Sequence, residues 1–364
     1  MQQDVKLTRE VSPYIRKNWT SRRVMIDVLI ALLPVVVFAI YRFGHHSLIR
    51  LVVGVAVAIL TEALIFPLSQ KPERKAEGFK KFLSRYKNFT SLNIFSAAVT
   101  GLILALQLPA YINVYVVVVG SIVSIGLGKM IFGGTGNNIF NPAALGRVFV
   151  ALAFGTFFQT GYFPKDVVAG ATPLTLVKAD GISISLKNYN LIDLFIGKIP
   201  GSMGEISAVA ILLGAAYLIY RKVADWKIML AVVAPVALFA LFAGLGSPNV
   251  LNEQLGEYVL YHLLTGGLLF GAIFMATDPV TSPLHVTTKI LFGLVIAIIT
   301  TLNRLFGPMP EGMVFSILFA NMLTPLFDRI KIFRNKFTWQ FGVAYGFSVL
   351  AMILIVYFGV GGKF

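Results

Sequence analysis

Apolar residues recur along the chain in eleven runs, most of them close to the length of a membrane span. The runs occupy about 24–41, 48–68, 91–108, 112–132, 140–158, 206–220, 227–243, 261–276, 289–305, 312–327 and 340–360. A helix needs about 20 mostly apolar residues to cross a bilayer. Several runs are shorter or interrupted by Gly and Pro, which is typical of discontinuous helices around a binding site. The pattern therefore predicts an all-α polytopic membrane protein.

The two halves of the chain resemble each other in their fifth spans. Phe140, Asn141 and Pro142 stand at the start of one, and the segment 319–325 places Phe, Asn and Pro in the other. Because five is odd, two consecutive five-span blocks run with opposite topology, as in inverted-repeat transporters. We expect two inverted five-helix repeats plus an extra C-terminal transmembrane span. The predicted segments are 1–23 (amino-terminal), 24–158 (first repeat), 159–205 (outer loop), 206–327 (second repeat) and 328–364 (basic linker and last span).

Composition supports the membrane class and narrows the chemistry. The chain has 364 residues, of which 57% are hydrophobic and 13% charged, whereas soluble domains carry about 25% charged residues. The absence of cysteine excludes disulfides and thiolate-bound iron–sulfur clusters. The four His are scattered without metal-ligand spacing, so no metal site is predicted. Redox chemistry here would need an organic cofactor.

The net charge of +15 reflects membrane topology. With the amino terminus inside, 23 of the 31 basic residues fall in inner loops, as the positive-inside bias requires. We therefore expect a cytoplasmic amino terminus and no nucleic-acid partner. The first apolar run follows a basic segment and lacks a cleavage pattern, so no signal peptide is expected. The basic segment 70–90 is expected to be a solvated loop, with contact to anionic lipid or a soluble partner as the alternative.

The predicted outer loop contains the sequence Gly170-Ala171-Thr172-Pro173. Small neighbours and an extended backbone before proline would leave the Thr172 hydroxyl open to a modifying enzyme. The alternative is an ordinary turn in which Thr172 caps a helix that starts at Pro173. Both interpretations can hold together.

Two inner segments are candidate polar sites at breaks in the membrane helices. The first contains Gly133, Gly134, Asn137 and Asn141; it lacks the Lys of a phosphate-binding loop and the third glycine of a dinucleotide fingerprint. It remains a glycine-rich turn into a helix, which could hold an anion or a polarised carbonyl, or simply be a tight turn. The second, around Asp278, is either a helix stop or a buried polar site at a broken helix.

Two carboxylates are expected within the membrane, where ionised groups are costly and usually functional. Asp27 lies one turn from Arg22 and Arg23 and is expected to pair at the interface. Glu62, in the second span, is the better candidate for an ion path.

Together the segments GATPLT, GGTGNNIFNPAALGR and ATDPVTSP resemble the D subunit of Rnf, the ion-translocating ferredoxin:NAD oxidoreductase complex, and the related B subunit of sodium-translocating NADH:quinone reductase. The resemblance covers roughly residues 20–330. It implies FMN esterified through its phosphate to Thr172, attached outside the cytoplasm by a flavin transferase. Ala169 stands where the family often has Ser, and the last span exceeds the family's ten-helix pattern.

The resemblance also implies a second flavin, riboflavin, in the related subunits, and partner subunits that carry iron–sulfur clusters and another covalent flavin. The chain would be a subunit, not catalytic alone, in the cytoplasmic membrane of a prokaryote, with its flavin loop outside. It would relay electrons through FMN and couple this to Na⁺ or H⁺ translocation. For the second flavin or the ion path, the candidate residues are Gly133, Gly134, Asn137, Asn141, Asp278 and Glu62. The alternatives are an inverted-repeat transporter or channel, or a scaffold subunit, neither with a flavin.

Overall fold

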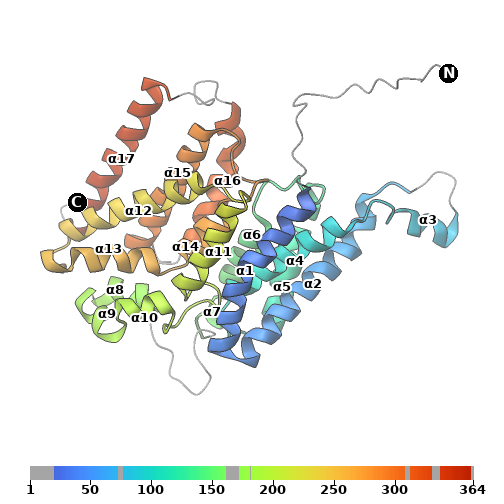
Figure 1. The fold of residues 1–364 in the computed structure, drawn as a ribbon, viewed down its shortest axis with the longest axis horizontal. Helices are drawn as coiled ribbons and strands as arrows, with labels where there is room; N and C mark the ends of the chain where they lie inside the picture. The colour runs from blue at the N-terminus through green and yellow to red at the C-terminus, as the bar shows by residue number, and fades with distance from the viewer. Residues whose placement is uncertain are drawn as a thin grey trace.

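The computed structural model describes residues 20–72, 77–160, 172–180, 182–307, 312–329 and 337–361 (Figure 1). Every regular element among them is a helix, apart from one isolated bridge between Pro109 and Ser202. The helices are α1 (Ser21–Phe43), α2 (His45–Ser69), α3 (Gly78–Ser84), α4 (Ser91–Leu106), α5 (Val114–Gly126), η1 (Met130–Phe132), α6 (Pro142–Ala153), α7 (Gly155–Thr160), α8 (Pro173–Asp180), α9 (Ile182–Asn188), α10 (Leu191–Ile196), α11 (Ala208–Tyr220), α12 (Trp226–Gly246), η2 (Asn252–Gln254), α13 (Leu255–Leu264), α14 (Leu268–Phe270), η3 (Gly271–Met275), α15 (Val286–Leu305), α16 (Met313–Arg329) and α17 (Trp339–Val360).

Six of these stretches are long and apolar enough to cross a membrane: α1, α2, α5 with η1, α12, α15 and α17. The pair Asn252–Leu264 and Leu268–Met275, bent by 54°, forms a seventh candidate. The shorter helices α4, α6 and α11 are also apolar. All eleven predicted apolar runs coincide with helices, so the prediction of an all-α polytopic membrane protein is confirmed. The inverted symmetry of the two halves stays a prediction.

Small residues allow the helices of the first half to meet closely. In α2, Gly54 lies against α4, where a Cβ atom on Gly101 would stand 2.5 Å from the Gly54 carbonyl oxygen. Because lipid offers no hydrophobic drive for helix association, such backbone contact is a main source of packing energy. Helix α2 contacts α4 and α5, and α5 contacts α6.

The second half is built around α12, which packs against α13, α15 and α17. One close approach again involves glycine, since a Cβ on Gly293 of α15 would lie 2.4 Å from the Cβ of Ala231. The two halves meet where α1 packs on α11 and α6 packs on α16 (Figure 1). Elements from both halves therefore surround the space between these two helix pairs.

The segment 159–205, predicted as a connecting loop, contains the short helices α8, α9 and α10 in its described part. Helix α8 contacts α15, and α10 contacts α11 and α13. Apolar side chains explain this docking, because Leu174, Ile182 and Leu194 are buried. This part of the connection is therefore folded onto the bundle, while its side of the membrane stays a prediction.

Candidate functional site

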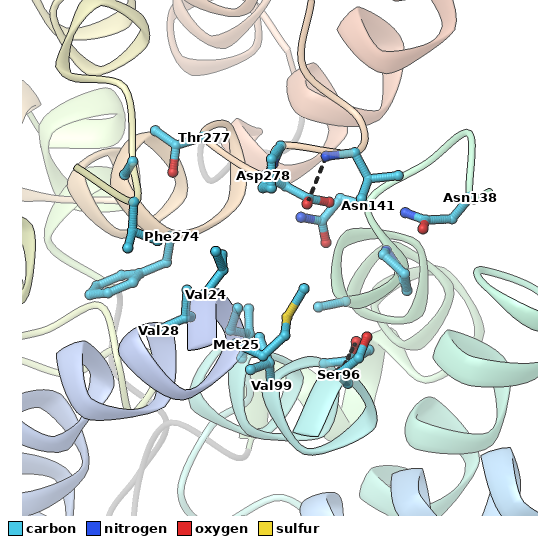
Figure 2. A pocket seen from close by; sticks show the side chains of 18 of the residues that line it. Val24, Met25, Val28, Ser96, Val99, Asn138, Asn141, Phe274, Thr277 and Asp278 are labelled. Atoms are coloured by element: carbon cyan, nitrogen blue, oxygen red, sulfur yellow. Dashed lines mark hydrogen bonds between the residues drawn. The ribbon is translucent and has the colours of Figure 1, made fainter. Parts of the chain in front are cut away.

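A central cavity of about 80 Å³ lies where the two halves meet (Figure 2). Its walls come from α1, α4, the start of α6, the end of α11 and the broken helix before Asp278. Figure 2 shows Met25, Val99 and Phe274 on its apolar side and Asn138, Asn141 and Asp278 on its polar side. The site joins segments more than 250 residues apart in the sequence.

Asn141 connects the two halves at this cavity. Its side-chain oxygen accepts a hydrogen bond from Ala144 N (3.2 Å) and so caps α6, whose first residue is Pro142. Its backbone N–H donates to Oδ1 of Asn321 on α16 (3.0 Å), and its Nδ2 donates to the Met275 carbonyl (3.3 Å). The two asparagines of the matching Phe–Asn–Pro segments therefore contact each other directly. Sequence comparison of the halves points to Asn321 but gives no reason to include it in the site.

Asp278 follows the π-helical turn η3 and lines the same cavity. Its carboxylate accepts hydrogen bonds from Val280 N (3.2 Å) and from the Thr281 hydroxyl (3.2 Å). The segment ends a helix and is also a polar site, in which Asp278 is half-buried and Thr277 and Thr281 are buried.

Glu62 is buried in an ion pair, and this corrects the expectation of an uncompensated carboxylate. Its Oε2 lies 2.5 Å from Nζ of Lys129, and the two side chains are 1% and 2% exposed, respectively. Lys129 Nζ also donates to the Ser96 hydroxyl (2.9 Å), while Asn93 Nδ2 and the Thr135 hydroxyl donate to Glu62 Oε1 (3.2 and 3.4 Å). Lys129 and Ser96 line the central cavity, but Glu62 does not.

Lys129 is the main functional candidate that the sequence analysis missed. Its charge alone places Lys129 in an inner loop. The one sequence feature that indicates a functional role is its position four residues before the glycine-rich turn. Arg147, assigned in the same way, is also buried and donates from Nε to the Gln107 carbonyl (2.9 Å).

The glycine-rich turn contributes different residues from those predicted. Gly133, Gly134 and Gly136 have positive φ angles of 105°, 92° and 94°, which explains the glycines in this tight turn. Asn137 Nδ2 donates to the Gly133 carbonyl (3.4 Å) and Asn137 is exposed. Of the predicted residues here, Asn141 lines the cavity, whereas Gly133, Gly134 and Asn137 do not; Thr135, Gly136 and Asn138 do.

Asp27 is held by α11 across the contact between the halves. It accepts hydrogen bonds from Tyr217 (3.0 Å) and Arg221 (3.2 Å). Asp27 therefore pairs with Arg221, which is distant in the sequence from the predicted partners Arg22 and Arg23.

Thr172 lies outside the central cavity, at the start of α8. Its carbonyl accepts from Leu176 N (3.1 Å), which confirms the helix start at Pro173, and its hydroxyl lies 2.5 Å from that of Thr175. Thr172 is half-buried beside a small cavity of about 20 Å³ that is also lined by Glu205 and Gly266. Gly170 and Ala171 fall outside the described residues.

No group of three or more potential metal ligands occurs among the His, Asp and Glu of the described segments. The central cavity offers one half-buried carboxylate (Asp278), the amide side chains of Asn138 and Asn141 and the ammonium group of Lys129.

Known proteins of similar sequence cover most of the chain. The D subunit of the Na⁺-translocating ferredoxin:NAD⁺ oxidoreductase complex of Acetobacterium woodii is 36% identical over 330 residues, 90% of this chain and 94% of that protein. The D subunit of the proton-translocating ferredoxin:NAD⁺ oxidoreductase complex of Clostridium ljungdahlii is 35% identical over 327 residues, 87% of this chain and 92% of that protein.

The similarity extends to a second type of complex. The B subunit of the Na⁺-translocating NADH-quinone reductase of Chromohalobacter salexigens is 41% identical over 241 residues, 65% of this chain and 58% of that protein. A sequence profile of the NQR2, RnfD, RnfE family matches residues 8–337. Because this match and the two D subunits span most of the sequence, the chain belongs to the NQR2, RnfD, RnfE family.

Proposed function

We propose that this chain is the membrane subunit of an Rnf-type, ion-translocating ferredoxin:NAD oxidoreductase complex. The observation that carries the proposal is the similarity to two D subunits, each over more than nine-tenths of its length. The chain would work with other membrane, iron–sulfur and flavin subunits and would not be catalytic alone. It would lie in the cytoplasmic membrane of a prokaryote.

The electron relay would use FMN attached through its phosphate to the Thr172 hydroxyl. The attachment point fits such a group, because Thr172 is half-buried and directly precedes α8. A helix amino terminus favours a nearby anion through its free N–H groups and its dipole. Bound there, FMN would supply electron transfer. The chain's own part is to fix the position of the phosphate and to keep α8 docked on α15.

Mass analysis of the Thr172 peptide and in-gel flavin fluorescence test this attachment, with the flavin transferase co-expressed. We expect fluorescence in the unmutated chain and none in Thr172→Ala, because no other atom of that side chain can form the ester. Thr175→Ala is the matched control: its hydroxyl contacts that of Thr172 but lies outside the motif, so fluorescence should persist. Fluorescence that survives in Thr172→Ala and vanishes in Thr175→Ala would contradict the proposal.

The central cavity suits an ion path better than a second flavin. A volume of about 80 Å³ holds a few water molecules, each of which takes about 30 Å³ in the liquid. The three fused rings of riboflavin are too large for this space. Asp278 offers a carboxylate to a cation, and Asn138 and Asn141 offer amide oxygens to Na⁺ or to waters that carry H⁺.

Ion pumping by the complex in sealed vesicles tests the path at Asp278. We expect Asp278→Asn to lower the number of ions moved per electron. An unchanged ratio in Asp278→Asn would show that coupling occurs elsewhere in the complex. The relatives include Na⁺- and proton-translocating complexes, so the measurement is made with each ion in turn.

A further inference from the structure

A second cavity, larger than the central one, lies between α8, α13, α15 and the end of α17. This interfacial cavity has a volume of about 330 Å³ and is lined by residues that include Lys178, Asn249, His262, Arg304 and Val360. It shares no lining residue with the central cavity. Figure 1 shows the carboxyl end of α17 beside α12 and α13, with α8 next to α13.

The ends of three membrane helices place this cavity at a membrane surface. Helices α12, α15 and α17 are each long enough to span, and they end at Gly246, Leu305 and Val360. Ser247, Leu305 and Val360 all line the cavity. Since the apolar length of each span fills the hydrocarbon layer, the ends of the spans lie at the level of the lipid headgroups.

The lining is polar and basic. It includes Lys178 and Arg304, and its described residues include no Asp or Glu. Lys178 is exposed, and its Nζ donates to the Gly307 carbonyl at the end of α15. Arg304 Nη2 donates to the Thr265 carbonyl (2.9 Å). A ligand that neutralises this charge is an anion.

A buried imidazole also contributes to the wall of the cavity. His262 is 4% exposed and lines the cavity, and its Nε2 has no hydrogen-bond partner among the described residues. A buried polar group without a partner is costly and rare in native proteins.

We propose that the interfacial cavity binds the phosphate headgroup of an anionic phospholipid. A lipid fits better than a soluble anion because α17, which forms one wall, exposes large apolar side chains along its length, including Phe347 (73%), Leu350 (55%) and Leu354 (47%). Acyl chains can lie against such a surface while the phosphate reaches Lys178. Helix α17 also lies beyond the residues that match the family profile, 8–337. Of the lining residues, only Gly359 and Val360 lie in this helix. The proposal does not depend on the proposed electron relay.

Lipid binding by the full chain tests the proposal. The protein is placed in nanodiscs of phosphatidylcholine, phosphatidylglycerol is titrated in, and bound lipid is counted by native mass spectrometry. We expect saturable binding of phosphatidylglycerol over phosphatidylcholine. Lys178→Gln should weaken it about fivefold, the effect of one basic residue near an anionic lipid. Lys187→Gln, which removes an exposed lysine of α9 that does not line the cavity, should leave it unchanged.

A variant that alters the shape of the cavity gives a second, independent result. Asn249 is exposed in the turn after α12, so Asn249→Leu should fold and should also reduce phosphatidylglycerol binding. Equal binding of the two lipids, or equal effects of Lys178→Gln and Lys187→Gln, would overturn the proposal. A phosphate group attached to Thr172 is the competing occupant of the cavity. If Thr172→Ala loses a bound phosphate group, and the unmutated chain shows no preference for phosphatidylglycerol, this occupant is favoured and the lipid proposal is overturned.

Discussion

Lys129 and Glu62 place two opposite charges inside the first half of the molecule. Removing two charges from water costs several kcal/mol each, and their attraction offsets this only when the remaining donors and acceptors are satisfied. Here Ser96 and Asn93 supply those further hydrogen bonds. The ammonium group borders the central cavity while the carboxylate stands behind it. The ion pair therefore presents its ammonium side to the cavity.

Replacing one partner of this ion pair should lower the stability of the protein more than replacing both partners together. We expect Lys129→Met to cost about 3–5 kcal/mol of stability, because it leaves the Glu62 carboxylate buried and unpaired. The double variant Glu62→Gln/Lys129→Met buries no charge and should recover most of the loss. Thermal unfolding of the purified chain in detergent measures both. A double variant as unstable as Lys129→Met would show that the ammonium group acts through contacts other than Glu62.

At the scale of elements, Asp225 joins the starts of two membrane helices. Its carboxylate caps α12 by accepting from Lys227 N (3.0 Å), and it pairs with Lys289 Nζ of α15 (2.8 Å). Burial alone would raise the pKa of Asp225, but the hydrogen bonds from Lys289 and Lys227 and the charges of these lysines outweigh burial and lower the pKa. This one side chain thus links the starts of α12 and α15, which pack together, and fixes their relative positions along the helix axes.

The lowered pKa of Asp225 makes this junction sensitive to acid. A carboxylate whose pKa is lower in the folded state stabilises the protein above its unfolded pKa, about 3.9, and this contribution is lost as the pH falls through the folded value. Asp225→Ser keeps a cap but lacks the charge. We expect it to be about 0.5–1 kcal/mol less stable at pH 7, as for a partly exposed pair, and this difference should shrink as the pH falls to about 3, below the unfolded pKa. A difference of the same size at both pH values would rule out the carboxylate as its source.

Between α13 and α14 the backbone leaves the helical conformation, and a side chain of another helix stabilises this break. Gly266 and Gly267 have φ angles of 64° and 66°, and a Cβ on Gly267 would stand 2.6 Å from Glu205 Cδ. Arg304 of α15 donates to the carbonyls of Thr265 and Gly266 that the break leaves without helical partners. Irregular backbone within a membrane protein needs such internal partners.

At the scale of the whole molecule, the two halves meet through polar contacts at the central cavity and through apolar packing elsewhere. Asn141 and Asn321 join α6 to α16, and Asp27 joins α1 to α11. Both junctions use side chains from helices that lie far apart in sequence.

Membrane orientation is the property of the whole molecule that labelling can test. We expect Lys81→Cys to react from the cytoplasmic side and Lys187→Cys from the outside; both lysines are exposed and no native cysteine competes. Without the buried Lys129 and Arg147, 21 of the 31 basic residues still fall in inner loops, so the charge bias survives. Reaction of both positions from one side would contradict the predicted orientation and the external placement of Thr172.

The sequence by itself determined the class of fold and the position of the helices. Helix formation in a membrane follows from apolar length and from local signals, so the runs, the start of α6 after Asn141 and the start of α8 after Thr172 were all predictable. Helices α9 and α10 were not, because short segments of mixed polarity become helical mainly by docking on a surface that the sequence does not display.

Only the tertiary structure decided which polar residues share a site. Lys129 resembled a loop lysine because a charge pattern carries no information about partners 67 residues away, and Glu62 resembled an uncompensated carboxylate for the same reason. The contact between Asn141 and Asn321 depends on how α6 and α16 cross. Side-chain packing determines this crossing, and the hydrophobic periodicity of the sequence does not. The ends of α12, α15 and α17 come together at the interfacial cavity, and the packing of the whole bundle brings them there.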